Sequence, residues 1–218
     1  MDCYTELKKR HRNERDRWPQ NLSLRVHRAL SWLHRAEQCE DEDGRFIFLW
    51  IAFNAAYAQD LAELGHGREQ EKSRAFIDKL IELDEEETLY NLLWEEFSAS
   101  VRILLNNPYV FAPFWEYQQG NKTDEGWQNA FEMAKTSANH ALGARDAGKV
   151  LGLVLSRLYT LRNQLVHGGA TWGSDVNRDQ LSDSTRFLGK LVPKIIELMM
   201  DNPNTLWGDP SFPVVTAL

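Results

Sequence analysis

The segment Leu161–Gly169, which reads LRNQLVHGG, contains three side chains whose types suit chemistry on a phosphodiester. An arginine can hold a phosphate through two parallel hydrogen bonds and stabilise the additional negative charge of a transition state. A histidine, with an ordinary pKa of about 6.5, can take the proton from a 2′-OH or give one to a leaving 5′-oxygen. Arg162, Asn163 and His167 are therefore candidates for cleaving RNA without a metal ion.

A helix expected over residues 146–167, closed by Gly168 and Gly169, has to position these side chains. At about 100° per residue, its apolar residues form one continuous stripe. The stripe consists of Leu151, Val154, Leu155, Leu158, Leu161 and Leu165. Arg162 falls inside it, about 20° from Leu151. Because a buried lone charge costs several kcal/mol, we expect this guanidinium to meet a partner side chain, a neighbouring subunit or a ligand.

The opposite side of the same helix is small and polar. Asn163 and His167 share it with Gly152 and Ser156, which permits close approach by another helix or by a substrate backbone. One histidine per chain is too few for a reaction that needs both an acid and a base, and a twofold axis would supply the second one. The structural alternative stays open: Arg162 can be an ordinary paired arginine, and His167 can simply end a helix before two glycines.

Arg162 and Asn163, followed by His167, resemble the signature of HEPN domains, in which an arginine and a polar residue precede a histidine after a short spacer. LRNQLVHGG is similar to the Apea-like HEPN branch in particular. An upstream segment, LWIAFNAAY, which contains Phe53 and Asn54, resembles the matching helix of that branch. The stretch between Gly65 and Arg145 has no counterpart, so the resemblance covers about half of the chain.

The resemblance implies an all-α, HEPN-like helical bundle that forms a homodimer with the two motifs facing one cleft. It implies an RNA substrate, cleavage to a cyclic phosphate, and a role as a toxin with an antitoxin partner or in phage defence. His167 would be the acid/base, Arg162 the phosphate clamp and Asn163 a positioning residue, and Asn54 would orient the motif. Some members of the family are non-catalytic RNA-binding or dimerisation modules, and that alternative stays open.

The composition bounds the class of protein. The chain has 218 residues, is 43% hydrophobic and includes 8 Trp, 10 Phe and 6 Tyr, which favours a folded core and excludes a disordered chain. Its 2 cysteines, Cys3 and Cys39, form no metal-binding motif, so we expect neither a disulfide framework nor a metal or cofactor. The charged N-terminus and the short apolar stretches predict a cytoplasmic protein without membrane contact.

The charge is unevenly distributed. The formal net charge is −7, but residues 1–35 carry +5 and the remainder −12. Any contact with RNA is therefore expected to be local. The basic run that begins at Lys8 and ends at Arg17 is either an RNA-backbone track or a solvated helix face. His27 and His34 share a helix face, but no third ligand is spaced to complete a metal site.

Hydrophobic periodicity predicts helices throughout and no long strand. The expected helices cover residues 4–17, 23–38, 45–64, 69–83, 84–105, 124–142, 146–167 and 177–200. Asp84 and Glu87 have the spacing of a capping box, the stretch 106–117 is expected to be irregular, and Pro193 is expected to kink or break the last helix. We expect one all-α domain over 1–218, with residues 65–145 as a possible inserted helical lobe.

Overall fold

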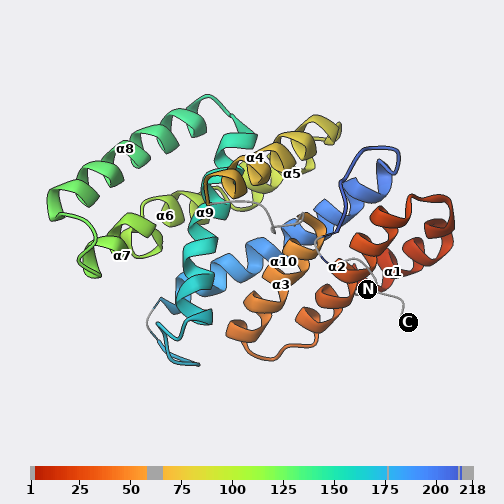
Figure 1. Cartoon of the computed structure of the whole chain (residues 1–218), viewed down its shortest axis with the longest axis horizontal. Coiled ribbons are helices and arrows are strands. Elements are labelled where there is room, and N and C mark those ends of the chain that lie inside the picture. The colour runs from red at the N-terminus through yellow and green to blue at the C-terminus, as the bar shows by residue number, and fades with distance from the viewer. Residues whose placement is uncertain (1–2, 58–65, 176, 211, 213–218) are drawn as a thin grey trace. The chain divides into compact units, whose positions relative to one another are not determined.

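A computed structural model describes residues 3–57, 66–175, 177–210 and 212, and in these residues every regular element is a helix (Figure 1). The predicted all-α fold class is therefore confirmed. The chain divides into two compact units: Met1–Glu86 with Thr185–Leu218, and Glu87–Ser184. The second unit is thus inserted in the sequence between the two segments of the first. The inserted lobe expected over residues 65–145 stays a prediction.

The first unit is built around a pair of helices, of which the first is amphipathic and the second is apolar nearly all round. α2 (Gln20–Glu37) and α3 (Glu42–Tyr57) pack along each other. α1 (Cys3–Glu14), the short 3₁₀ helix η1 (Arg15–Arg17) and α4 (His66–Leu83) belong to the same unit. Leu22, Val26, Leu30 and Leu33 recur at helical spacing on α2 and are buried, which explains why this segment folds as a half-buried helix.

A buried arginine fixes the C-terminal tail to the first unit. Arg25 is fully buried and donates hydrogen bonds to the carbonyl oxygens of Ala56 at 3.0 Å, Gly208 at 3.1 Å and Asp209 at 2.6 Å. Burial lowers the pKa of its guanidinium to about 10. Trp207 is also buried. The C-terminal tail is therefore anchored through its backbone up to residue 209.

The second unit carries the RNxxxH motif. Its elements are α5 (Thr88–Asn91), a π-helical turn η2 (Leu92–Glu96), α6 (Ser98–Leu105), a 3₁₀ turn η3 (Pro108–Val110), α7 (Ala112–Gln118), α8 (Asp124–Gly143) and α9 (Ala147–Val166). α9 contacts α6, α8 and η3. The last helix, α10 (Arg178–Asp201), begins in this unit and continues into the first, and it does not break at Pro193.

Two local predictions are wrong. No helix starts from a capping box at Asp84, because its N–H bonds back to the carbonyl of Ile81 and the residue thus belongs to the end of α4. The next helix begins at Thr88 after Glu87, which has a φ of 53° and makes no side-chain cap. The stretch 106–117 is largely helical, since Pro113 stands in the first turn of α7, where a missing N–H has no cost.

The predicted helix over 45–64 is seen as α3 up to Tyr57, and its remainder lies outside the described residues. In the described part of the chain, no helix combines the length and the apolar character that crossing a membrane requires.

Candidate active site on helix α9

Both ends of α9 are fixed by hydrogen bonds that its sequence provides. At the start, the Asp146 carboxylate accepts the N–H of Lys149 at 2.9 Å and so satisfies one free donor of the first turn. At the end, Gly168 has a φ of 70°, its N–H bonds to Leu165, and the N–H of Gly169 bonds to Gln164 at 2.7 Å. This is a Schellman motif, which stops the helix directly after the motif residues.

His167 is the C-cap residue of α9 and is exposed. Its backbone N–H bonds to the carbonyl of Asn163 at 3.0 Å, so the backbone completes the last helical turn while the imidazole stays accessible to solvent. The structure therefore brings His167 to the end of the helix one turn beyond Asn163.

Arg162 and Asn163 interact with each other. Nη1 of Arg162 donates a hydrogen bond of 2.8 Å to Oδ1 of Asn163, and both side chains are half-buried. Among the described residues, no carboxylate lies within ion-pair distance of Arg162. The guanidinium is thus held by a neutral amide, an arrangement that suits a site for an anion.

The buried arginine of α9 is Arg157, which the helical wheel did not identify. Arg157 is 6% exposed, whereas Arg162 is half-buried because the apolar stripe leaves the core in the last turn. The Arg157 guanidinium lies over the Phe111 ring at 4.3 Å, and Nη2 donates to the carbonyl of Leu105 at 3.4 Å. Burial lowers the pKa of Arg157 to about 10. Phe111 belongs to the aromatic segment 109–117, which is the sequence signal for this contact. Because that segment is expected from the sequence to be irregular, no packing partner is predicted for it.

The polar stripe of α9 forms an accessible face. Ser156 and His167 are exposed, and Gly152 and Asn163 are half-buried. Two large apolar side chains stand beside Arg162 and Asn163 on this face: Tyr159 is 43% exposed and Val166 is 49% exposed. Exposed apolar groups around a cation and an amide are typical of surfaces that another macromolecule covers.

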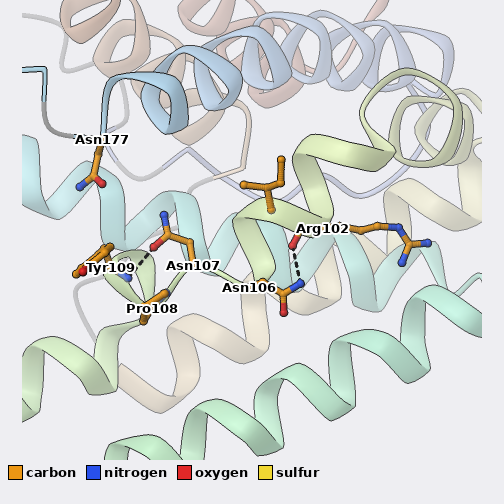
Figure 2. A pocket seen from close by; sticks show the side chains of 7 residues that line it. Arg102, Asn106, Asn107, Pro108, Tyr109 and Asn177 are labelled. Atoms are coloured by element: carbon orange, nitrogen blue, oxygen red, sulfur yellow. Dashed lines mark hydrogen bonds between the residues drawn. The ribbon is translucent and has the colours of Figure 1, made fainter.

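An open pocket of about 580 Å³ lies elsewhere in the second unit (Figure 2). It is lined by Arg102, Ile103, Asn106, Asn107, Pro108, Tyr109 and Asn177. The amides are tied to the backbone: Asn106 donates to the carbonyl of Arg102 at 3.0 Å, and Asn107 accepts the N–H of Tyr109 at 2.8 Å. Sequence reasoning missed this pocket, although the run NNPY marks the turn that forms one wall.

One hydrogen bond connects the pocket wall to the motif helix. Nε2 of Gln164 donates to the carbonyl of Tyr109 at 2.5 Å, and Gln164 is the residue after Asn163. The same carbonyl accepts the indole N–H of Trp115 at 2.8 Å. The turn at residues 108–110 is therefore fastened to α9 beside the candidate site.

Asn54, predicted to orient the motif, lies half-buried on α3 of the first unit. Since the motif belongs to the second unit, the expected contact between Asn54 and the motif stays a prediction. Within the described ranges, no group of three or more His, Cys, Asp and Glu side chains has a geometry that could hold a metal ion. His34 instead stacks on Tyr4, with the ring centroids 4.0 Å apart.

No protein-family model matches the chain, and no curated protein or solved structure is significantly similar to it.

Proposed function

We propose that the protein is a metal-independent endoribonuclease of HEPN type, acting as a homodimer on RNA. The proposal is based on the side chains at the end of α9. There an arginine is held by a neutral amide, with no carboxylate partner in the described part of the chain, and an exposed histidine follows one turn later. A cation for the phosphate and an imidazole for proton transfer are the two groups that cleavage through a 2′-oxygen needs.

In the proposed reaction, the imidazole of His167 takes the proton from the 2′-OH of the substrate. The 2′-oxygen then forms a bond to phosphorus while the bond from phosphorus to the 5′-oxygen breaks. The products are a 2′,3′-cyclic phosphate and a 5′-OH, which receives a proton. Arg162 stabilises the charge that develops on the non-bridging oxygens, and Asn163 keeps the guanidinium in position.

Dimerisation is proposed because one chain supplies a single histidine at this site. Base and acid act in the same displacement, so a second imidazole has to protonate the leaving oxygen. The accessible face of α9, with Tyr159 and Val166 beside the motif, supports a contact with a second copy of the chain. A symmetric contact through this face would place two copies of the motif at one seam. A toxin or phage-defence role, with an antitoxin or defence partner, belongs to the same proposal.

A second candidate function is a non-catalytic HEPN-like module that binds RNA or holds a dimer. The Schellman motif at residues 164–169 favours it, because it accounts for His167 and both glycines without chemistry. In that case Arg162 and Asn163 serve the contact between subunits. Arg162→Ala would then dissociate the dimer in size-exclusion chromatography, and no cleavage would occur under any condition.

The test is an RNA cleavage assay in EDTA, followed by analysis of the product ends. The proposed ribonuclease yields fragments with a cyclic phosphate, and a 2′-O-methyl substrate of the same sequence stays intact because it has no free nucleophile. Cleavage that requires a divalent metal ion, or that also occurs on the 2′-O-methyl substrate, contradicts the proposed mechanism. Binding without cleavage of either substrate supports the non-catalytic module.

A further inference from the structure

The first unit carries a group of basic side chains that are close enough to repel one another. This basic cluster comes from α1, η1 and α2. It consists of Lys8, His11, Arg12, Arg15, His27 and Arg28. The first four recur at intervals of three and four residues, which places them along one face of α1 and its continuation into η1.

Contacts between α1 and α2 bring the members together. Nζ of Lys8 lies 3.2 Å from Nδ1 of His27, and the rings of His11 and His27 have centroids 5.9 Å apart. An ammonium can only donate, so Nδ1 of His27 accepts and its Nε2 carries the proton. Nε2 of His11 is 3.2 Å from the carbonyl of Ser23, to which it donates.

The charges of the cluster oppose one another. Burial lowers the pKa of Lys8, and the nearby Arg12 and Arg15 lower it further. The pKa of His27 is likewise lowered by burial first, then by the cations Lys8, Arg15 and Arg28. Such repulsion is a cost that the isolated fold carries and that a bound anion would relieve.

Carboxylates pair more closely with a neighbouring cation than with the cluster in the described part of the chain. Arg10, on another side of α1, contacts Glu14 at 3.1 Å and Asp201 at 2.7 Å. In the cluster, the one ion pair among the described residues joins Arg15 to Asp16 at 3.7 Å, and both side chains are largely exposed. An exposed ion pair of this kind contributes little to the stability of the fold.

One buried polar atom inside the cluster is Nδ1 of His11. Nδ1 of His11 makes no hydrogen bond within the described part of the molecule, although His11 is fully buried. Its other neighbours are the rings of Trp18 and His27. Buried polar atoms are nearly always paired. A second proton on the ring would make Nδ1 a donor, and only in that form can it contact a bound phosphate.

We propose that the basic cluster is a phosphate-binding site and that the phosphates belong to the backbone of single-stranded RNA. The site lies in the unit that does not contain the α9 motif, so this inference goes beyond the proposed cleavage. The choice of RNA over a small phosphate compound rests on that proposed function. Contacts to phosphate position a nucleic acid without reading its sequence. Because the chain as a whole has a net charge of −7, we expect RNA to be attracted to the basic cluster and not to the rest of the surface.

The test is a binding titration with a labelled, single-stranded 2′-O-methyl oligonucleotide in EDTA, followed by fluorescence anisotropy at several salt concentrations. Arg12→Ala and Arg15→Ala each remove an exposed cation of the cluster. Each is expected to weaken binding by about tenfold and to lower the salt slope by about 0.7, the value for one phosphate contact on a single strand. Thermal melting by circular dichroism checks that both variants are folded.

Lys9→Ala is the matched control, because Lys9 is an exposed cation on the same helix and outside the cluster. It is expected to change the affinity by about twofold or less. Equal losses in Lys9→Ala and Arg12→Ala, or no binding by the wild-type protein, overturn the proposal. Since the oligonucleotide cannot be cleaved, a binding result stands whether or not His167 is catalytic.

Pyrophosphate, titrated into the preformed complex, identifies the chemistry of the ligand. Displacement of the oligonucleotide, together with weaker binding of pyrophosphate by Arg12→Ala, supports a phosphate site. If the oligonucleotide binds independently of Arg12 while pyrophosphate binding depends on it, the assignment to RNA is overturned and a small phosphate compound is the ligand.

Discussion

Arg162 donates a hydrogen bond from Nη1 to Oδ1 of Asn163, the next residue on α9, over 2.8 Å. The contact orients the guanidinium at the end of the helix without neutralising it, since the amide is uncharged. A carboxylate in the same place would form an ion pair and reduce the positive charge available to a phosphate. The pairing of Arg162 with Asn163 therefore suits a site that binds an anion.

Asn163→Asp is predicted to lower RNA cleavage by about tenfold or more, because it replaces the neutral partner of Arg162 with a negative charge. The same change is predicted to leave the free energy of unfolding unchanged or slightly higher, since the new ion pair is half-buried. Initial cleavage rates and urea denaturation measure the two effects. Full activity in Asn163→Asp would show that the charge of Arg162 is not used.

Gly168→Ala is predicted to reduce the free energy of unfolding by about 1 kcal/mol, because Gly168 has a φ of 70° and alanine is strained there. Gly143→Ala is the control: this glycine ends α8, and an added Cβ would meet nothing within 4 Å. The control is predicted to be neutral or to stabilise by up to about 1 kcal/mol. Equal destabilisation of both variants in urea would contradict the assigned Schellman motif.

The sequence predicts those parts of the fold that depend on local pattern. The helices over α2, α8, α9 and α10 follow from apolar residues at helical spacing, and Gly168 marks the end of α9 because few other residues adopt its φ. The small polar face with Ser156 and Asn163 is also visible on a helical wheel.

Features that depend on contacts between distant segments could not be predicted. The wheel ranked Arg162 as the buried arginine, but Arg157 is buried because the ring of Phe111 covers it. Nothing in the spacing of α9 reveals a ring that comes from residue 111. The basic cluster around Lys8 likewise depends on the contact with His27, 19 residues further along the chain.

Arg157→Ala is predicted to destabilise the protein by about 2–4 kcal/mol, because it opens a cavity beneath Phe111 and removes the donor to Leu105. Arg157→Met keeps an unbranched stem of similar length and removes a charge whose burial is unfavourable. It is therefore predicted to cost about 1 kcal/mol or less. Urea denaturation of both variants provides the comparison. A larger loss of stability in Arg157→Met than in Arg157→Ala would mean that the charge itself stabilises the fold.

Stability is predicted to fall as the pH drops below about 6.5, partly because of His11. Burial lowers the pKa of His11 in the folded protein, with the nearby cations Lys8 and Arg15 adding to the effect and the Ser23 carbonyl opposing it. The unfolded chain therefore takes up the proton first as the pH falls, and unfolding becomes easier between the unfolded and the folded pKa. Above that window His11 contributes no penalty.

His11→Gln isolates this contribution, because glutamine can still donate to Ser23 and does not titrate. Between about pH 7.5 and pH 5.5 the variant is predicted to lose less stability than the wild type, by up to about 1 kcal/mol. Free energies of unfolding in urea at the two pH values give the difference. Identical losses in both proteins would mean that His11 does not take up a proton preferentially on unfolding.

The proposed proton transfer by His167 during RNA cleavage is tested by comparing His167→Ala with His140→Ala in EDTA. His140 is an exposed histidine at the end of α8 in the same unit, so it controls for the loss of an imidazole. We predict that the wild type and His140→Ala cleave RNA equally. His167→Ala should remain a dimer by light scattering but cleave about 10² to 10⁴ times more slowly. Undiminished cleavage by His167→Ala would contradict the account.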